Sequence, residues 1–181
     1  SIPFYMVVTD FADVHSMWFN SNPDRFYVAS DLVRDRAISC RINPEKIIVS
    51  GIPVNPIFSY RHPPKPELKK TLGLDPDLTT LLIVGSRRVS GIPDFLRSLE
   101  HLDQPFQVVV IAGGDNALFE KCRRQSWNFP IHFKNFVTNM PDWMLASDAL
   151  ITKAGGLIIS EGLAAGLPII LIDYLPGQEE R

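Results

Sequence analysis

Short apolar runs alternate with amphipathic stretches along the chain, and this alternation restricts the fold more than any other feature. Several runs are apolar throughout, as in strands of a parallel sheet that are buried on both faces. The stretches between them have the periodicity of helices that cover such a sheet. Strands that alternate with helices are typical of stacked βα units. The sequence therefore predicts an α/β protein with a doubly wound parallel sheet.

The predicted elements follow one another in regular order. Strands are predicted at residues 4–9, 26–29, 46–50, 81–84, 107–112, 131–135, 149–151 and 168–172. Helices are predicted at residues 32–40, 65–72, 94–102, 117–124, 141–146 and 157–165. Two of these helices have clear start signals: Ser30 or Asp31 can cap the first, and Pro93 with Asp94 opens the third.

Prolines recur through residues 53–66, which indicates a stiff linker between two βα blocks. The block before it has too few strands for an independent doubly wound domain. We therefore predict a partial domain at residues 1–57, a proline-rich linker at 58–66, and a larger domain at 67–181 that lacks its closing helix. The chain opens with Ser1-Ile2-Pro3 and without an initiator Met, so we expect the natural amino terminus to lie upstream.

The composition excludes several classes of protein. Hydrophobic residues make up 45% and charged residues 21%, a balance typical of a globular protein with a core. A formal net charge of -2 argues against nucleic acid as a partner. Cys40 and Cys122 lie far apart, which disfavours a disulfide framework or a zinc site and favours a reducing, cytoplasmic compartment. Charged residues, glycines and a proline interrupt the apolar region at 157–175, so any membrane contact should be peripheral.

The most informative motif follows the predicted strand at 149–151. Gly155 and Gly156 allow the backbone to approach a ligand, and the helix that follows offers unpaired N–H groups to a diphosphate. Such a site would need no metal ion. Glu161 lies about one turn inside this helix, where its carboxylate can accept both ribose hydroxyls of a nucleotide. The alternative interpretation is a tight turn followed by a solvated glutamate.

Two further loops carry candidate residues. After the strand at 81–84 come Gly85, Ser86 and two arginines, of which Arg87 or Arg88 can pair with a phosphate or lie in a solvated turn. After the first strand of the chain come Asp10 and His15, candidates for the general base that an attacking hydroxyl requires. A lone Asp and a lone His are more often structural.

These segments together resemble a known family. The run from Thr152 to Glu161, the run 166–171 and the run 176–179 are similar to the processive diacylglycerol glycosyltransferases and the plant monogalactosyldiacylglycerol synthases. The segments 8–18, 26–31 and 51–54 resemble the second half of that family's acceptor domain. The resemblance implies the glycosyltransferase type B fold, in which two doubly wound domains face each other across a cleft. Residues 1–57 would then belong to the acceptor domain and 67–181 to the nucleotide-sugar donor domain.

The resemblance also implies roles for single residues. The donor-binding residues would be Gly85, Arg87, Phe136, Val137, Lys153, Gly155, Gly156, Glu161, Gln178 and Glu179. Phe136 and Val137 would border the uracil, although a lone Phe is more often a core residue. Gln178 and Glu179 would contact hydroxyls of the donated sugar, or form an exposed turn. The given sequence departs from the family's pattern in two places. It does not contain the glycine-rich amino-terminal loop, and arginines stand after Gly85 where relatives have more glycines. Both departures favour the alternative of a noncatalytic module.

The resemblance implies an inverting transferase that moves a hexose from a UDP-sugar to diacylglycerol or a related glycolipid, without a metal ion, at the membrane surface. One alternative is a UDP-sugar epimerase of the same fold. Another is a noncatalytic module that binds a nucleotide or a lipid. A nicotinamide-binding protein is disfavoured because no G-x-G-x-x-G follows a predicted strand.

Overall fold

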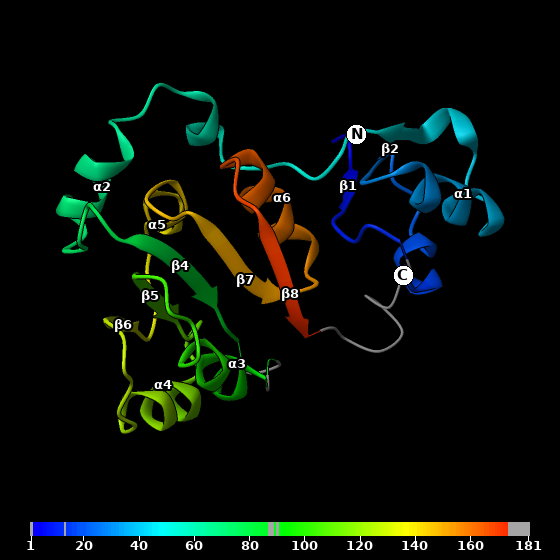
Figure 1. Ribbon diagram of the computed structural model, residues 1–181. Coiled ribbons are helices and arrows are strands. Elements are labelled where there is room, and N and C mark those ends of the chain that lie inside the picture. The colour runs from blue at the N-terminus through cyan, green and yellow to red at the C-terminus, as the bar shows by residue number, and fades with distance from the viewer. Residues whose placement is uncertain (1, 13, 87–88, 90, 174–181) are drawn as a thin grey trace. The chain divides into compact units, whose positions relative to one another are not determined.

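The computed structural model describes residues 2–12, 14–86, 89 and 91–173. The described residues form two compact units, one of residues 2–54 with 155–160 and the other of residues 55–154 with 161–173. Each unit has its own parallel sheet (Figure 1). The predicted α/β class is therefore confirmed.

The smaller unit contains a parallel sheet in the order β1-β2-β3, formed by β1 (Tyr5–Val8), β2 (Arg25–Val28) and β3 (Ile47–Val49). The helix α1 (Asp31–Ser39) and the 3-10 helices η1 (Ser16–Phe19) and η2 (Pro44–Lys46) complete it. The Ser30 hydroxyl accepts a hydrogen bond from the Val33 N–H at 3.3 Å, so Ser30 is the helix cap, one of the two predicted. The core consists of Val8, Val14, Phe19, Phe26, Val28, Val33 and Ala37.

The larger unit contains a parallel sheet in the order β6-β5-β4-β7-β8 (Figure 1). Its strands are β4 (Thr79–Val84), β5 (Phe106–Ile111), β6 (Ile131–Lys134), β7 (Ala149–Lys153) and β8 (Ile169–Asp173). Its helices are α2 (Lys65–Thr71), α3 (Ile92–Leu99), α4 (Asn116–Arg123) and α5 (Met140–Leu145), and α6 (Gly156–Ala164) divides between the two units, with residues 161–164 in the larger one. Every predicted strand and helix is present, with ends shifted by at most a few residues.

Helices lie on both faces of the five-stranded sheet. On one face, Ile92 and Leu96 of α3 and Leu118 of α4 pack in a core with Ile83 and Val110. On the opposite face, α6 packs closely through Gly162, because a Cβ there would lie 2.6 Å from Leu150 Cδ2. Every residue of β5 is buried, as predicted for a strand that is covered on both faces.

The proline-rich stretch contains one helical turn that the sequence did not predict. The 3-10 helix η3 (Pro56–Ser59) extends into it, whereas α2 begins at Lys65, as predicted. Prolines lie in the first turn of both helices, where the missing N–H removes no intrahelical hydrogen bond. The interpretation of residues 58–66 as a linker without helical turns is therefore wrong at residues 58–59, where η3 ends.

Asp148 ties α2 to the amino ends of two central strands. Its carboxylate accepts hydrogen bonds from Lys65 Nζ at 2.8 Å, from Lys69 Nζ at 2.9 Å and from the Thr80 N–H at 2.8 Å. The Lys69 side chain is only 6% exposed and also donates to the Leu78 carbonyl. Burial alone would raise the pKa of Asp148, but the hydrogen bonds from Lys65, Thr80 and Lys69 and the charge of Lys65 lower it.

This cluster predicts a stability loss in Asp148→Asn. The variant leaves the Lys69 ammonium buried without its counter-ion, and we expect the free energy of unfolding to fall by about 2 kcal/mol near neutral pH. The pKa of Asp148 is lower in the folded state than its ordinary value of 3.8. The extra stability of the wild type over the variant is therefore complete when the pH is above 3.8, and it is lost as the pH falls through the folded-state pKa. Urea titrations at several pH values measure this. The exposed Asp103→Asn is the control, and equal losses in both variants would contradict the prediction.

Candidate functional site

The centre of the five-stranded sheet is a topological switch point. The neighbouring strands β4 and β7 pair in parallel, and the chain leaves β4 toward β5 on one side and β7 toward β8 on the other. Loops that diverge in this way leave a crevice beyond the carboxyl ends of the strands, where doubly wound sheets bind ligands. The loops after β4 and β7 are also those that the sequence motifs predicted as the donor site.

The loop after β4 begins with a glycine that packing requires. Gly85 is buried, and a Cβ there would lie 2.7 Å from Leu118 Cδ2 and 2.8 Å from Ile92 Cδ1. Its carbonyl oxygen lies against Gly113, where φ is +64° and a Cβ would come within 2.3 Å of it. The structure thus gives Gly85 a packing role between β4, α3 and α4. Arg87 and Arg88 of the same loop lie outside the described residues.

The loop after β7 leads directly into α6. Lys153 ends β7 and is half-buried, and its pairing with β8 is irregular at Thr152 and Lys153. Gly155 and Gly156 are half-buried, and α6 begins at Gly156. The Ile159 N–H donates to the Gly155 carbonyl at 3.1 Å, so the amides before it lie at the helix end where an anion can bind.

Glu161 lies in the middle of α6 and is half-buried. Its carboxylate makes no hydrogen bond or ion pair with any described residue. Burial raises the pKa of this carboxyl above its ordinary value. The adjacent Gly162 fixes the helix against Leu150 and Ile169 of the sheet, and this contact determines where Glu161 lies. The side chain can therefore accept two hydrogen bonds from a ligand.

The end of β6 adds a residue that the sequence analysis missed. Asn135 Nδ2 donates to Asn116 Oδ1 at 2.6 Å, and the Asn135 carbonyl accepts from the Gly114 N–H at 2.9 Å. Asn135 thereby holds the start of the loop that carries Phe136 and Val137. Its Oδ1 is buried without a hydrogen-bond partner. The signal that could have indicated it was an amide residue at the carboxyl end of the predicted strand 131–135.

Phe136 is 69% exposed, and Val137 is half-buried. The burial expected for a lone Phe is therefore wrong at this position. An exposed aromatic ring beyond the carboxyl end of β6 suits a surface on which a planar base can pack. Gln178 and Glu179, the predicted sugar contacts, lie outside the described residues.

The two predicted catalytic residues lie in the smaller unit. Asp10 follows β1 and is half-buried. His15 is exposed, and its Nδ1 accepts the Met17 N–H at 3.2 Å as the cap of η1. This bond gives His15 a structural role and occupies one of its two ring nitrogens.

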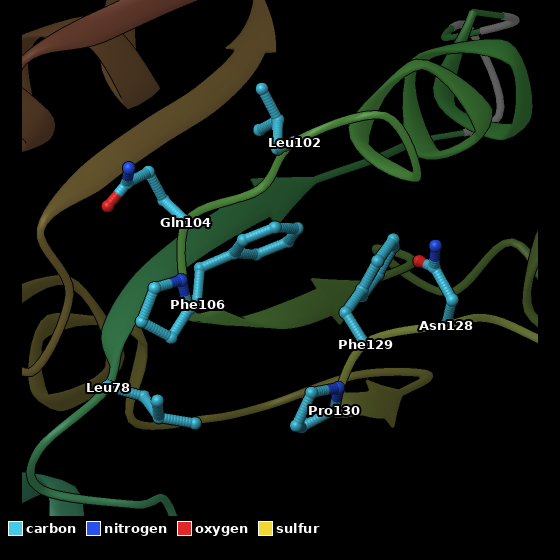
Figure 2. A pocket seen from close by; sticks show the side chains of 8 residues that line it. Leu78, Leu102, Gln104, Phe106, Asn128, Phe129 and Pro130 are labelled. Carbon is cyan, nitrogen blue, oxygen red and sulfur yellow. The ribbon is translucent and has the colours of Figure 1, made fainter.

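A cavity of about 310 Å³ lies at the opposite edge of the five-stranded sheet (Figure 2). It is lined by Leu78, Leu102, Gln104, Pro105, Phe106, Asn128, Phe129 and Pro130. Leu78 and Pro130 precede β4 and β6, and Phe106 begins β5, so the cavity lies at the amino ends of the strands. None of the predicted donor-binding residues lines it, and we do not assign it to the donor site.

The described residues contain no group of three or more His, Cys, Asp or Glu side chains placed to hold a metal ion. Within the same part of the chain, no helix has the length and apolarity needed to cross a membrane.

Comparisons with known proteins match both units. Residues 1–54 match the family model for monogalactosyldiacylglycerol (MGDG) synthase, and residues 79–180 match that for the glycosyltransferase family 28 C-terminal domain. The MGDG synthase of Spinacia oleracea is 39% identical over 98% of this chain, and the probable MGDG synthase of Nicotiana tabacum is 38% identical over 98%. The chain covers 36% and 35% of these two relatives.

Two solved structures have a similar fold. HepE of Anabaena in complex with UDP-glucose gives a TM-score of 0.60 at 15% identity, over 93% of this chain and 53% of that one. A glycosyltransferase of Rickettsia africae gives a TM-score of 0.56 at 17% identity, over 92% of this chain and 50% of that one. The predicted type B fold and the predicted resemblance are both confirmed. The chain belongs to glycosyltransferase family 28, and the MGDG synthases are among its relatives.

Proposed function

We propose that the protein transfers a hexose from a UDP-sugar to diacylglycerol or a related glycolipid, with inversion at the anomeric carbon. The observation that carries the donor half of this proposal is the half-buried Glu161 carboxylate, which has no partner among the described residues. The names of the relatives support the lipid acceptor. A solved neighbour holds UDP-glucose, which supports the donor.

In this reaction the acceptor hydroxyl attacks the anomeric carbon and loses its proton, while UDP departs from the opposite face. Glu161 would hold the two ribose hydroxyls, and Phe136 would pack on the uracil. The amides at the start of α6 would stabilise the negative charge that grows on the departing diphosphate. Asp10 and His15 are the candidates for the general base, and His15 Nδ1 also caps η1.

The direct test is product formation. The full-length protein, incubated with UDP-galactose or UDP-glucose and detergent-dispersed diacylglycerol, should form a glycolipid of opposite anomeric configuration to the donor. An epimerase would interconvert the UDP-sugars without using the lipid. A noncatalytic module would bind UDP and release no product. Either of these two results would contradict the proposal.

Substitution of Glu161 should weaken donor binding without unfolding the protein. A carboxylate that accepts two sheltered hydrogen bonds contributes roughly 1.5 to 3 kcal/mol per bond, so Glu161→Ala should lower UDP affinity about tenfold or more. Glu161→Gln should lose less, because its amide oxygen still accepts one bond. Calorimetric titration with UDP, with thermal melts alongside, measures both. Glu67→Ala on α2 is the control. Equal UDP affinity in the wild type and all variants would contradict the proposed contact between Glu161 and the ribose hydroxyls.

The pKa of Glu161 predicts a pH dependence of donor binding. Only the ionised carboxylate accepts from both hydroxyls, and burial raises its pKa above the ordinary value of 4.5. Affinity for UDP-glucose should therefore fall as the pH is lowered. The fall should begin at a higher pH than it would for an exposed glutamate with an ordinary pKa. UDP-glucose is the suitable ligand because its diphosphate lacks the second ionisation of a terminal phosphate near pH 6. Glu161→Gln should remove this dependence, and an unchanged profile in that variant would refute the assignment.

Donor binding should not require a divalent metal. The glycines and the positive end of α6 can neutralise the diphosphate through N–H groups alone. UDP titrations with excess chelator and with added magnesium should give the same affinity within error. A collapse of affinity in the chelator would show that a metal ion takes this role instead.

A further inference from the structure

The connection from β5 to α4, residues 112–115, contacts two loops of the predicted donor site. Toward β4, Gly113 packs against Gly85, because a Cβ on Gly113 would collide with the Gly85 carbonyl oxygen. Toward β6, the Gly114 N–H donates to the Asn135 carbonyl at 2.9 Å. Gly113 and Gly114 have φ values of +64° and +81°, which glycine adopts without strain. The connection therefore links the loop after β4 to the loop after β6.

A side-chain hydrogen bond strengthens the link to the loop after β6. Asn135 Nδ2 donates to Asn116 Oδ1 at 2.6 Å. Asn116 is the first residue of α4, and the preceding residue Asp115 is the cap of this helix. The Asp115 carboxylate accepts from the Ala117 and Leu118 N–H groups. Helix capping therefore does not account for the Asn116 side chain.

The Asn135 amide is poorly suited to a purely structural role. Its Oδ1 is buried and has no hydrogen-bond partner among the described residues. An unpaired buried acceptor costs free energy, and this cost opposes the gain from the bond between Nδ2 and Asn116. The pair therefore contributes little to the stability of the unit. What it does provide is a fixed position for Asn135.

That position determines where the next two residues lie. The Asn135 carbonyl and the Phe136 N–H belong to one planar peptide, so the bond from Gly114 sets the direction of both groups. The bond from Nδ2 to Asn116 restrains the same residue through its side chain. Phe136 and Val137, the predicted uracil-binding residues, therefore begin from a restrained backbone.

We propose that Asn135 and Asn116 are positioning residues for the base of the nucleotide donor. Their bond keeps Phe136 and Val137 in register with the loop after β4, so that one ligand can fill the base site and the diphosphate site together. The inference rests on the proposed function, because it takes UDP as the ligand. A base site that is ordered in advance loses less entropy on binding, which raises affinity for the nucleotide but not for diphosphate alone.

The first experiment compares UDP with inorganic diphosphate in the full-length protein. By calorimetry, Asn135→Ala should bind UDP about fivefold to tenfold more weakly than the wild type. Inorganic diphosphate, measured as a competitor of UDP, should bind both proteins equally. The melting temperature should change by less than about 3 °C, because the lost bond and the removed unpaired oxygen have opposite effects. Equal UDP affinity, or equal losses for both ligands, would overturn the proposal.

The second experiment removes the bond from its other partner. Asn116→Ala should show the same selective loss of UDP affinity, and the double alanine variant should lose no more than either single variant. Asn116→Asp should keep the wild-type ratio of UDP affinity to diphosphate affinity, because a carboxylate oxygen accepts the same bond from Asn135 Nδ2. The diphosphate measurement corrects this ratio for the added charge. If Asn116→Asp behaves like Asn116→Ala, the bond has no positioning role.

Asn128→Ala is the matched control. Asn128 Nδ2 also makes one hydrogen bond, to the Glu100 carbonyl at 2.9 Å, but it lies at the cavity at the amino ends of the strands (Figure 2). This variant should bind UDP and diphosphate as the wild type does. A selective loss of UDP affinity in Asn128→Ala as large as that in Asn135→Ala would contradict the assignment.

The outcomes separate this inference from the proposed function. A wild-type protein that does not bind UDP contradicts the proposed donor, and the inference fails with it. A wild-type protein that binds UDP and forms glycolipid, while Asn135→Ala and Asn116→Ala bind UDP equally well, contradicts only the positioning role.

Discussion

The parallel pairing of β4 with β7 determines where the larger unit can bind a ligand. The chain departs from these two strands in opposite directions, so their carboxyl ends are not covered by a common connection. Gly85 makes this arrangement possible on the β4 side, because a side chain there would collide with Leu118 and Ile92. Gly162 lets α6 pack closely on β7, because a side chain there would collide with Leu150. Two packing glycines thus support the start of the loop after β4 and the helix after β7.

The amino ends of the same strands are secured by polar contacts. Asp148 accepts hydrogen bonds from the Thr80 N–H and from Lys65 and Lys69 of α2, and it connects this helix to the centre of the sheet. Such a cluster is stable only when each member keeps its partners, because an unpaired buried charge is costly. Strand β4 is therefore held at both ends. Its amino end is held by the hydrogen bond from Thr80 to Asp148, and its carboxyl half is held by burial of Leu82 and Ile83.

The order of strands and helices could be predicted because both signals are local. Alternating apolar runs indicated every strand, and Ser30 was correctly included among the caps of α1. The packing role of Gly85 could not be predicted, since it depends on Leu118 and Ile92, which are distant in sequence. The exposure of Phe136 and the link from Asn135 to Asn116 depend on tertiary contacts in the same way. The position of Glu161 in a helix that follows a strand and two glycines could be predicted because these signals are local. Its contact with a ribose stays a prediction.

The pairing of β4 with β7 also has a consequence for the order of folding. Leu81 pairs with Ala149, so this contact closes a loop of about 68 residues, whereas β4 with β5 and β7 with β8 join segments much nearer in sequence. Closing a longer loop loses more chain entropy, and contacts between distant segments form more slowly. We expect the two βα halves to form first and to join along β4 and β7 afterwards. The loops at the carboxyl ends of β4 and β7 would then come together late in folding, when the core that joins Ile83 and Ile151 forms.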